Sequence, residues 1–273
     1  MVNSIISTVG GKFGMRDVIV NNIIRNHTCF VEVFCGAAHV TLYKEPSDVE
    51  IINDLDFGIY SLFAVLRDNP DDLLYKIQCT PYSRKLFYEL KNSNPTSDLD
   101  RAYRFYIMNR LCFGGKRPDV ATFGYGFRVK RPPSWDKIED FLPVIERLKK
   151  VYIENLDFRM IIDKYDSEDT IFYIDSPYVG EEHHYYGIYR FDMHDHYDLF
   201  EKVSNIQGKC LLSYNDNPII RDMYKKYNIK EISRYNNIDK TIDDNREIAK
   251  ELLIANYEFP TDNLPLFKGV DSL

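Results

Sequence analysis

The chain has 273 residues, and its 44% apolar content is sufficient to bury the core of one large domain, or of one domain with an insertion. No stretch reaches the roughly 18 uncharged apolar residues that a membrane helix requires, and the amino-terminal sequence lacks the features of a signal peptide, so we expect a globular, cytoplasmic protein without a membrane partner. Its five cysteines are scattered and form no CxxC pair, which favours neither a disulfide framework nor a zinc site.

The charge of the chain is unevenly distributed. The net charge of −7 argues against a polyanionic partner, because nucleic-acid binders use cations to replace phosphate counterions. Residues 101–131, however, contain eight basic side chains and one acid, a local charge of +7 that leaves −14 for the rest of the chain. This segment is a candidate nucleic-acid-binding region, with an ordinary solvated surface as the alternative. The basic residues are Arg101, Arg104, Arg110, Lys116, Arg117, Arg128, Lys130 and Arg131.

The first predicted elements form the start of a nucleotide-binding α/β unit. Residues 30–34 are typical of a short buried strand, residues 35–38 of a tight turn of small side chains, and the following stretch of a helix. A second strand over residues 49–56 carries an acid, Asp54, near its end. In such folds ligands bind beyond the carboxyl ends of parallel strands, where Asp54 can accept hydrogen bonds from ribose hydroxyls.

The remainder of the chain is predicted to contain a helical region and then alternating strands and helices. The first predicted helices span residues 58–68, 71–77, 83–91 and 98–111. Loops and a hairpin rich in glycine and aromatic residues follow over residues 112–135, before a helix over residues 135–150. Further strands are predicted over residues 151–158, 170–178, 209–217 and 249–259.

Two glycine-containing turns are candidate cofactor sites. Gly10 and Gly11 precede Lys12, and such a loop can fold over a cofactor with the ammonium group near its carboxylate. In the turn after the first strand, Gly36 permits close approach of a ligand, and the carboxylate of Glu32 can reach a cationic or hydroxyl-bearing group. Neither turn has the three-glycine dinucleotide pattern or the Lys-Ser/Thr pair of a phosphate loop, so an ordinary turn remains the alternative at both places.

Asp175, Ser176, Pro177 and Tyr178 form the most specific motif, at the end of a predicted buried strand. A β-turn with Pro177 at its corner is the alternative. The Asp175 carboxylate and an adjacent backbone carbonyl can accept two hydrogen bonds from one exocyclic amino group, while Tyr178 offers a face on which a planar base stacks. An amino nitrogen held in this way directs its lone pair towards an in-line methyl group, so alignment accelerates transfer without a metal or a covalent intermediate.

The order of these motifs resembles that of the Dam-type DNA adenine N6-methyltransferases, over nearly the whole chain. The other matching segments are "VEVFCGAA", "INDLD", "FYIMNRLCFGG", "NLDF", "LLSYND" and "AKELLIANY". Ser176 replaces the first proline of the family's Asp-Pro-Pro-Tyr tetrad, but serine retains the backbone carbonyl that acts there. Ala38, Thr8 and Gly114 stand where the family usually has glycine, tryptophan and asparagine.

The resemblance implies an α/β fold: a Rossmann-like class I methyltransferase domain with a mixed central sheet and an inserted, mainly helical target-recognition domain. It places the catalytic, S-adenosylmethionine-binding domain at residues 1–56 and 146–273 and the target-recognition domain at residues 57–145. It also implies a site-specific enzyme that transfers a methyl group from S-adenosylmethionine to N6 of adenine in double-stranded DNA. Because N6 lies inside the duplex, the target base must be flipped out.

The resemblance also assigns roles to matching positions of this sequence. The expected catalytic residues are Asp175, Ser176, Pro177 and Tyr178. The expected cofactor-binding residues are Gly10, Gly11, Lys12, Glu32, Phe34, Cys35, Gly36, Asp54, Asp157 and Phe158. The expected DNA-binding residues are Asn109, Arg110, Lys116, Arg117, Arg128 and Lys130.

Three alternatives remain open from the sequence: methylation of cytosine N4, methylation of a protein glutamine amide, and a catalytically decayed DNA-binding paralogue. The spacing of the histidines forms no recognised ligand set, so we expect no metal site. We expect a monomer that binds double-stranded DNA, with a cognate restriction endonuclease as a second partner in a restriction-modification system. The histidines in question are four of the six in the sequence: His183, His184, His194 and His196.

Overall fold

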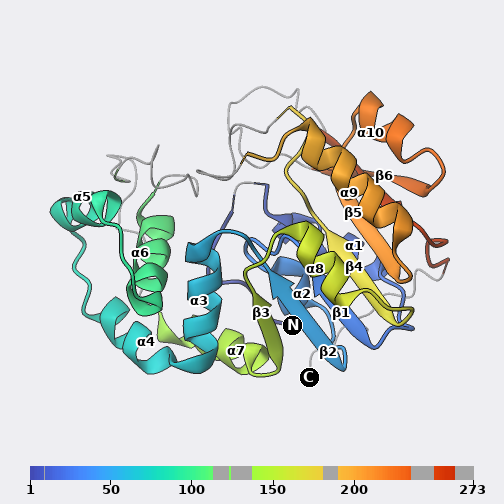
Figure 1. Cartoon of the computed structure of the whole chain (residues 1–273). Helices are drawn as coiled ribbons and strands as arrows, with labels where there is room; N and C mark the ends of the chain where they lie inside the picture. Colours follow the sequence, from blue (N-terminus) through green and yellow to red (C-terminus); the bar gives the residue numbers. More distant parts are fainter. Residues whose placement is uncertain (9, 113–122, 124–136, 181–189, 235–248, 262–273) are drawn as a thin grey trace, which may run out of the picture.

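A computed structural model describes residues 1–8, 10–112, 123, 137–180, 190–234 and 249–261 of the chain. Within these residues the strands form one seven-stranded sheet in the order β3-β2-β1-β4-β5-β7-β6, with helices around it (Figure 1). The strands are β1 (Cys29–Glu32), β2 (Val49–Asn53), β3 (Val151–Glu154), β4 (Thr170–Ile174), β5 (Lys209–Asn215), β6 (Asn228–Arg234) and β7 (Ala249–Ala255). The predicted α/β fold with a mixed sheet is confirmed.

The directions of the strands divide the sheet into two parts. Strands β3, β2, β1, β4 and β5 are parallel to one another. Strand β7 is antiparallel to both of its neighbours, β5 and β6. The parallel part therefore has all its carboxyl ends at one edge, which is the edge where ligands bind in folds of this kind.

The alternation of side chains along the strands fixes which helices cover each face. On one face, Phe172 and Ile174 of β4 share a hydrophobic cluster with α8 (Phe158–Tyr165), α9 (Met193–Asn205) and α10 (Pro218–Met223). On the other face, Ile171 and Tyr173 share a cluster with α1 (Arg16–Asn22) and with Val40 of α2 (His39–Tyr43). Both faces of the central strands are thus buried, and Figure 1 shows α8 and α9 side by side over one of them.

The helical region lies beside β3 and shares a core with the sheet (Figure 1). It contains α3 (Phe57–Asp68), α4 (Pro70–Gln78), α5 (Arg84–Asn92), α6 (Asp98–Leu111) and α7 (Ile138–Leu148). Ile52 of β2 and Val151 of β3 belong to the same hydrophobic cluster as Phe63, Phe87 and Ile107 of these helices. This one hydrophobic cluster contains residues of both the sheet and the helical region, so the two regions do not have separate cores. The domain boundaries at residues 57 and 145 therefore remain a prediction.

Several predicted elements differ from the structure at their ends. The helix predicted over residues 98–111 is confirmed as α6. The strand predicted over residues 151–158 is too long, because Asp157 accepts a hydrogen bond from the backbone N–H of Arg159 and caps α8. Strand β6 and the helices α1, α8, α9 and α10 were not predicted from the sequence.

Candidate active site

The turn that follows β4 lies where the strand order of the sheet reverses. From β1 the chain continues to β2 on one side, and from β4 it continues to β5 on the other. Asp175 is the first residue after β4, and Glu32 ends β1 directly opposite Tyr173. Ligands of open α/β sheets bind at the carboxyl ends of the strands at such a switch point. The predicted catalytic tetrad therefore begins at the ligand-binding position of the fold.

Lys12 connects the amino-terminal glycine turn to this tetrad. It begins a short 3-10 helix, η1 (Lys12–Gly14), and its side chain is only 4% exposed. Its Nζ donates hydrogen bonds to the carbonyl of Gly10 at 3.1 Å and to the hydroxyl of Tyr178 at 2.7 Å, and lies 2.8 Å from Oδ1 of Asp175. An ammonium group has three donors, so these three oxygens use all of them.

Two residues that the sequence analysis did not identify complete this cluster. Ser213 of β5 donates a hydrogen bond to Oδ1 of Asp175 at 2.9 Å, and its Oγ lies 3.0 Å from the hydroxyl of Tyr173. Tyr178 donates a hydrogen bond to Oε2 of Glu251, a residue of β7, at 3.0 Å. The available signal in the sequence was a serine and a glutamate within or beside the apolar runs of β5 and β7.

Asp175 retains one carboxylate oxygen for a ligand. Its Oδ1 contacts Lys12 and Ser213, whereas Oδ2 accepts no hydrogen bond from the described residues, and the side chain is 20% exposed. Burial raises the pKa of Asp175, while the Lys12 ammonium and the Ser213 hydroxyl act in the opposite direction. These two contacts favour the ionised carboxylate, which is the form that accepts hydrogen bonds from an amino group.

The ring of Tyr178 is largely buried, with an exposed fraction of 9%. It packs near Tyr214, with 6.2 Å between ring centroids. Burial raises the pKa of Tyr178, and the charges of Asp175 and Glu251 raise it further, so the hydroxyl remains protonated. Ser176 is also buried. The stacking of a base on Tyr178 remains a prediction, and only a small part of the ring surface is accessible for it.

The two predicted glycine turns depend on glycine for different reasons. Gly36 has a φ of +48°, which favours glycine, and its N–H donates to Oδ2 of Asp54 at 2.8 Å. A Cβ on Gly11 would lie 2.9 Å from the carbonyl oxygen of Thr8, which is too close. Asp54 also accepts from the N–H of Asp56, and burial raises the pKa of Asp54 to about 7. Its oxygens keep further lone pairs that can accept from a hydroxyl group.

The ends of β1, β2 and β3 are held together by Asn53, which the sequence analysis did not single out. Its amide nitrogen donates to the carbonyls of Val33 and Leu156, and its amide oxygen accepts from the N–H of Leu156. The backbone carbonyl of Asn53 accepts from the N–H of Cys35, whose thiol is buried. These bonds position the predicted cofactor turn relative to the neighbouring strand ends.

Glu32 supports the turn from the end of β1. Its Oε2 accepts hydrogen bonds from the backbone N–H of Thr41 at 2.9 Å and from the hydroxyl of Thr41. Thr41 lies in the first turn of α2, where backbone N–H groups lack partners within the helix. Burial raises the pKa of Glu32 to about 7. The carboxylate of Glu32 thus holds α2 against β1.

Phe34, Asp157 and Phe158 lie together at the same edge of the sheet. Phe34 and Phe158 have ring centroids 5.8 Å apart, and both contact Phe191. Asp157 caps α8 and forms an ion pair with Arg159 at 3.1 Å. The structure therefore brings these three predicted cofactor residues close to one another.

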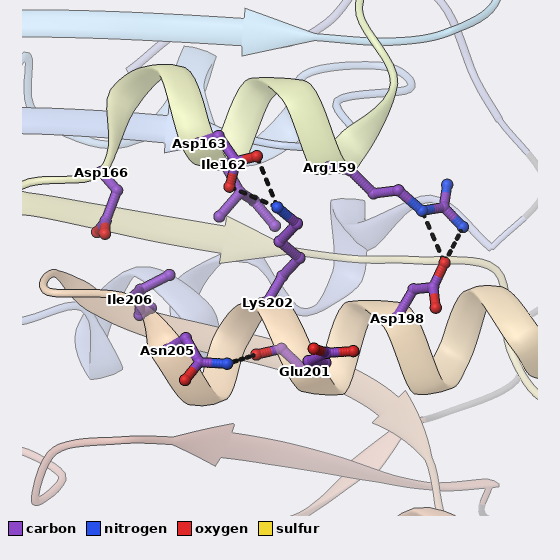
Figure 2. Close-up of a pocket in the computed structure, with 9 residues that line it drawn as sticks. All are labelled: Arg159, Ile162, Asp163, Asp166, Asp198, Glu201, Lys202, Asn205 and Ile206. Atoms are coloured by element: carbon purple, nitrogen blue, oxygen red, sulfur yellow. Dashed lines mark hydrogen bonds and ion pairs between the residues drawn. The ribbon is translucent and has the colours of Figure 1, made fainter.

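Arg159 also connects α8 to α9, as Figure 2 shows. Its guanidinium contacts Asp195 and lies 2.7 Å from Asp198, both on α9. At the other end of the same polar pocket, Lys202 of α9 lies 2.6 Å from Asp163 of α8. These ion pairs link the two helices near the protein surface, where an ion pair contributes little to stability.

The predicted DNA-binding residues are only partly described. Lys116, Arg117, Arg128 and Lys130 lie outside the described residues, as do His183 and His184. Arg110 is in the last turn of α6. Asn109, also on α6, donates from its amide nitrogen to the carbonyl of Ser7 at 2.6 Å and accepts from the N–H of Ser7 at 3.2 Å. Asn109 therefore links α6 to the segment that leads to Lys12.

The described residues contain no helix that is long and apolar enough to cross a membrane. Among the same residues, no three histidine, cysteine, aspartate or glutamate side chains lie together as candidate metal ligands. His196 is buried against Phe191 and Tyr214, and His194 is exposed on α9 near Asp198. Both histidines thus contact side chains of the protein.

Comparison with known proteins shows the family of the chain. The model of the D12 class N6 adenine-specific DNA methyltransferases matches residues 9–238, which include Lys12, Asp54 and the tetrad at Asp175–Tyr178. The chain belongs to this family. Its activity is methylation of adenine N6 in DNA, and the family does not favour the alternatives of a cytosine N4 or glutamine methyltransferase or of a decayed paralogue.

Curated relatives cover most of this D12 class chain at low identity. The Type II methyltransferase M.MjaIII of Methanocaldococcus jannaschii is 24% identical over 290 residues, which cover 94% of this chain and 99% of the relative. The Type II methyltransferase M.CviBI of Paramecium bursaria Chlorella virus NC1A is 23% identical and covers 82% of this chain and 86% of its own. The Type II methyltransferase M1.LlaDCHI of Lactococcus lactis subsp. cremoris is 23% identical over 91% of this chain and 93% of its own.

Proposed function

We propose that S-adenosylmethionine is the methyl donor and that the carboxyl ends of β1, β2 and β3 bind it. The residues there fit such a group: Gly36 and Gly11 expose backbone without a side chain, and Asp54 is a buried acceptor suited to ribose hydroxyls. Phe34, Cys35, Asp157, Phe158 and Glu32 form or support the same region. When bound, S-adenosylmethionine supplies a methyl group that is activated for transfer to a nitrogen.

In the proposed reaction, the N6 amino group of a flipped adenine donates one hydrogen bond to Oδ2 of Asp175 and one to the backbone carbonyl of Ser176. Pro177 restricts the turn, and Tyr178 contacts the base. Held in this way, the N6 lone pair would point towards the methyl group that a bound donor would supply. The new N–C bond would replace the donor's C–S bond, and N6 would lose one proton to water. The supporting observation is that Lys12 and Ser213 contact Oδ1 of Asp175, whereas Oδ2 accepts no hydrogen bond from the part of the chain that the structure describes.

We further propose that the basic segment binds double-stranded DNA. Arg110 and the basic residues after it contact phosphates, and Arg117 or Arg128 reads guanine in the major groove. The relatives carry the name Type II methyltransferase, and we propose the same class for this protein, with a restriction endonuclease of the same specificity as its partner. Asn109 contributes by joining α6 to the amino-terminal segment.

A single assay tests this function. The purified protein is incubated with unmethylated genomic DNA and S-adenosylmethionine labelled in the methyl group, and the DNA is digested to nucleosides. We expect label in N6-methyl-2′-deoxyadenosine, no label with Asp175→Ala, and full label with Asp163→Ala, which removes an exposed acid of α8. Single-molecule sequencing of the product then gives the recognition site. Label in another nucleoside, or an active Asp175→Ala variant, would contradict the proposal.

Calorimetry tests the cofactor assignment separately from catalysis. Asp54→Ala removes the proposed acceptor for the ribose hydroxyls and is expected to weaken S-adenosylmethionine binding about tenfold or more. Asp163→Ala again serves as the control. Unchanged affinity in Asp54→Ala would remove Asp54 from the cofactor site without affecting the assignment of Asp175.

A further inference from the structure

We propose that Glu251 is a positioning residue for methyl transfer, which fixes the hydroxyl of Tyr178 and balances the charge of Lys12 beside the catalytic carboxylate. This inference rests on the proposed roles of Asp175 and Tyr178. Glu251 is on β7, and its side chain is 3% exposed. Its Oε2 accepts the hydrogen bond of the Tyr178 hydroxyl at 3.0 Å and lies 3.8 Å from Nζ of Lys12.

The directions of the two hydrogen bonds at the Tyr178 hydroxyl make Glu251 the acceptor of its proton. Lys12 uses its three donors on the Gly10 carbonyl, the Tyr178 hydroxyl and Oδ1 of Asp175. The phenol oxygen of Tyr178 therefore accepts from Lys12, and its single proton points to Glu251. With both of its hydrogen bonds assigned, the hydroxyl holds the Tyr178 ring in one orientation. A charged acceptor makes this bond stronger than one to a neutral group.

The pattern of β7 indicates that packing alone does not require an acid here. Side chains alternate between the faces of a strand, so Glu251 shares its face with Leu253 and Ala255, which are fully buried and apolar. Replacing a buried ion pair by well-packed apolar residues is often neutral or stabilising. A leucine at position 251 would continue the core of this face. The carboxylate is therefore better explained by its contacts with Tyr178 and Lys12.

Glu251 also modifies the charge state of Asp175. Among the described residues, the groups near Asp175 are Lys12 from η1, Ser213 and Tyr214 from β5, Glu251 from β7, Glu32 from β1, and the hydroxyls of Tyr173 and Tyr178. Among them the negative charge of Glu251 raises the pKa of Asp175, and Lys12 and Ser213 lower it. Neutralising Glu251 while preserving its shape should therefore keep Asp175 ionised to a lower pH.

The test compares Glu251→Gln with Glu231→Gln, the same change on the neighbouring strand β6 at an exposed side chain. Rates are measured across pH on the DNA site mapped for the wild-type protein, at saturating S-adenosylmethionine. We expect Glu251→Gln to lower kcat about 10- to 100-fold, to leave the KM for S-adenosylmethionine unchanged, and to move the acid limb of the kcat profile to lower pH. Glu231→Gln should behave as wild type.

Tyr178→Phe provides a second, independent measurement. It removes only the hydroxyl, so it should lower kcat as Glu251→Gln does, and combining the two changes should cost little more than either alone. Thermal unfolding and S-adenosylmethionine affinity establish that each variant is folded, and if Glu251→Gln does not fold, Tyr178→Phe decides alone. Wild-type kcat in either variant, or fully additive losses, would overturn the proposal. If the wild-type protein itself methylated no DNA, the proposed function would fail instead.

Discussion

Lys12 and Asp175 come from the amino-terminal turn and the end of β4, and their side chains meet at 2.8 Å in an almost buried ion pair. This contact connects the glycine turn, where the cofactor is expected to bind, to the carboxylate that is expected to hold the substrate amino group. Removing one partner of a buried ion pair leaves the other charge without compensation, which is costly. The consequences for activity and stability can be measured at both residues.

Lys12→Met tests this ion pair directly. The substitution removes the charge that lowers the pKa of Asp175, so the pKa rises further and the acid limb of the kcat profile moves to higher pH. The direction is opposite to that expected for Glu251→Gln. We expect a loss of at least about 100-fold in kcat at neutral pH, since a buried pair is broken. Lys225→Met, at an exposed lysine, is the control, and an unmoved acid limb would contradict the prediction.

Glu32→Gln tests the effect of a buried carboxyl group on stability. Burial raises the pKa of Glu32 from 4.5 to about 7, so the folded protein holds this proton more tightly than the unfolded chain. The free energy of unfolding should therefore fall as pH rises from about 4.5 to 7, on the order of 1–3 kcal/mol from this group.

In Glu32→Gln the amide oxygen still accepts from Thr41 but does not titrate, so this part of the pH dependence should disappear. Urea unfolding at pH 5 and pH 8 measures the difference. Glu231→Gln is again the matched control, since Glu231 is an exposed glutamate. Identical pH dependence in wild type and Glu32→Gln would show that Glu32 does not contribute.

Asn109→Ala separates DNA binding from positioning. The sequence predicts that Asn109 contacts DNA, whereas in the structure both ends of its amide bind the backbone of Ser7. Because Ser7 leads to the turn that carries Lys12, we expect kcat to fall several-fold while the affinity for DNA changes little. Fluorescence anisotropy with labelled DNA and single-turnover rates measure the two effects. A loss confined to DNA affinity would favour the direct contact instead.

Arg128→Ala tests the basic segment. If Arg128 contacts a phosphate, the substitution should weaken binding to all DNA sequences and reduce the slope of log K against log salt by about 1. If Arg128 reads guanine, the salt slope changes less, and discrimination at one position of the site falls by about 1–3 kcal/mol. Lys85→Ala, at an exposed lysine of α5 outside this segment, is the comparison. Wild-type binding in Arg128→Ala would exclude both roles.

Much of the site could be predicted from the sequence because its motifs end parallel strands. Asp54 follows β2 and Asp175 follows β4, so the fold brings them to one edge without further information. Gly10, Gly11 and Lys12 were recognisable as a local turn, but the contact of Lys12 with Asp175 depends on tertiary structure. The structure does not test whether the Lys12 ammonium group also lies near a carboxylate of the cofactor, so that role stays a prediction.

Ser213 and Glu251 could not be identified in the same way. Their strands were predicted, but both residues are polar side chains in short apolar runs, and such runs do not show which face is buried. Their positions follow from the antiparallel pairing that places Ser213 opposite Leu253 and Asn215 opposite Glu251. Pairing between distant strands is set by the whole fold, and β6, whose only partner among the described strands is β7, was not predicted.

The position of β7 has a consequence for how the protein becomes active during synthesis. In the described part of the chain β7 is the last strand to be made, yet it lies between β5 and β6 and carries Glu251. A nascent chain that has emerged only as far as β6 has no partner for that strand and no acceptor for the Tyr178 hydroxyl. Competence to modify the genome would therefore arise only once β7 has been made, so that polypeptides that stop before β7 would leave no lasting marks on DNA.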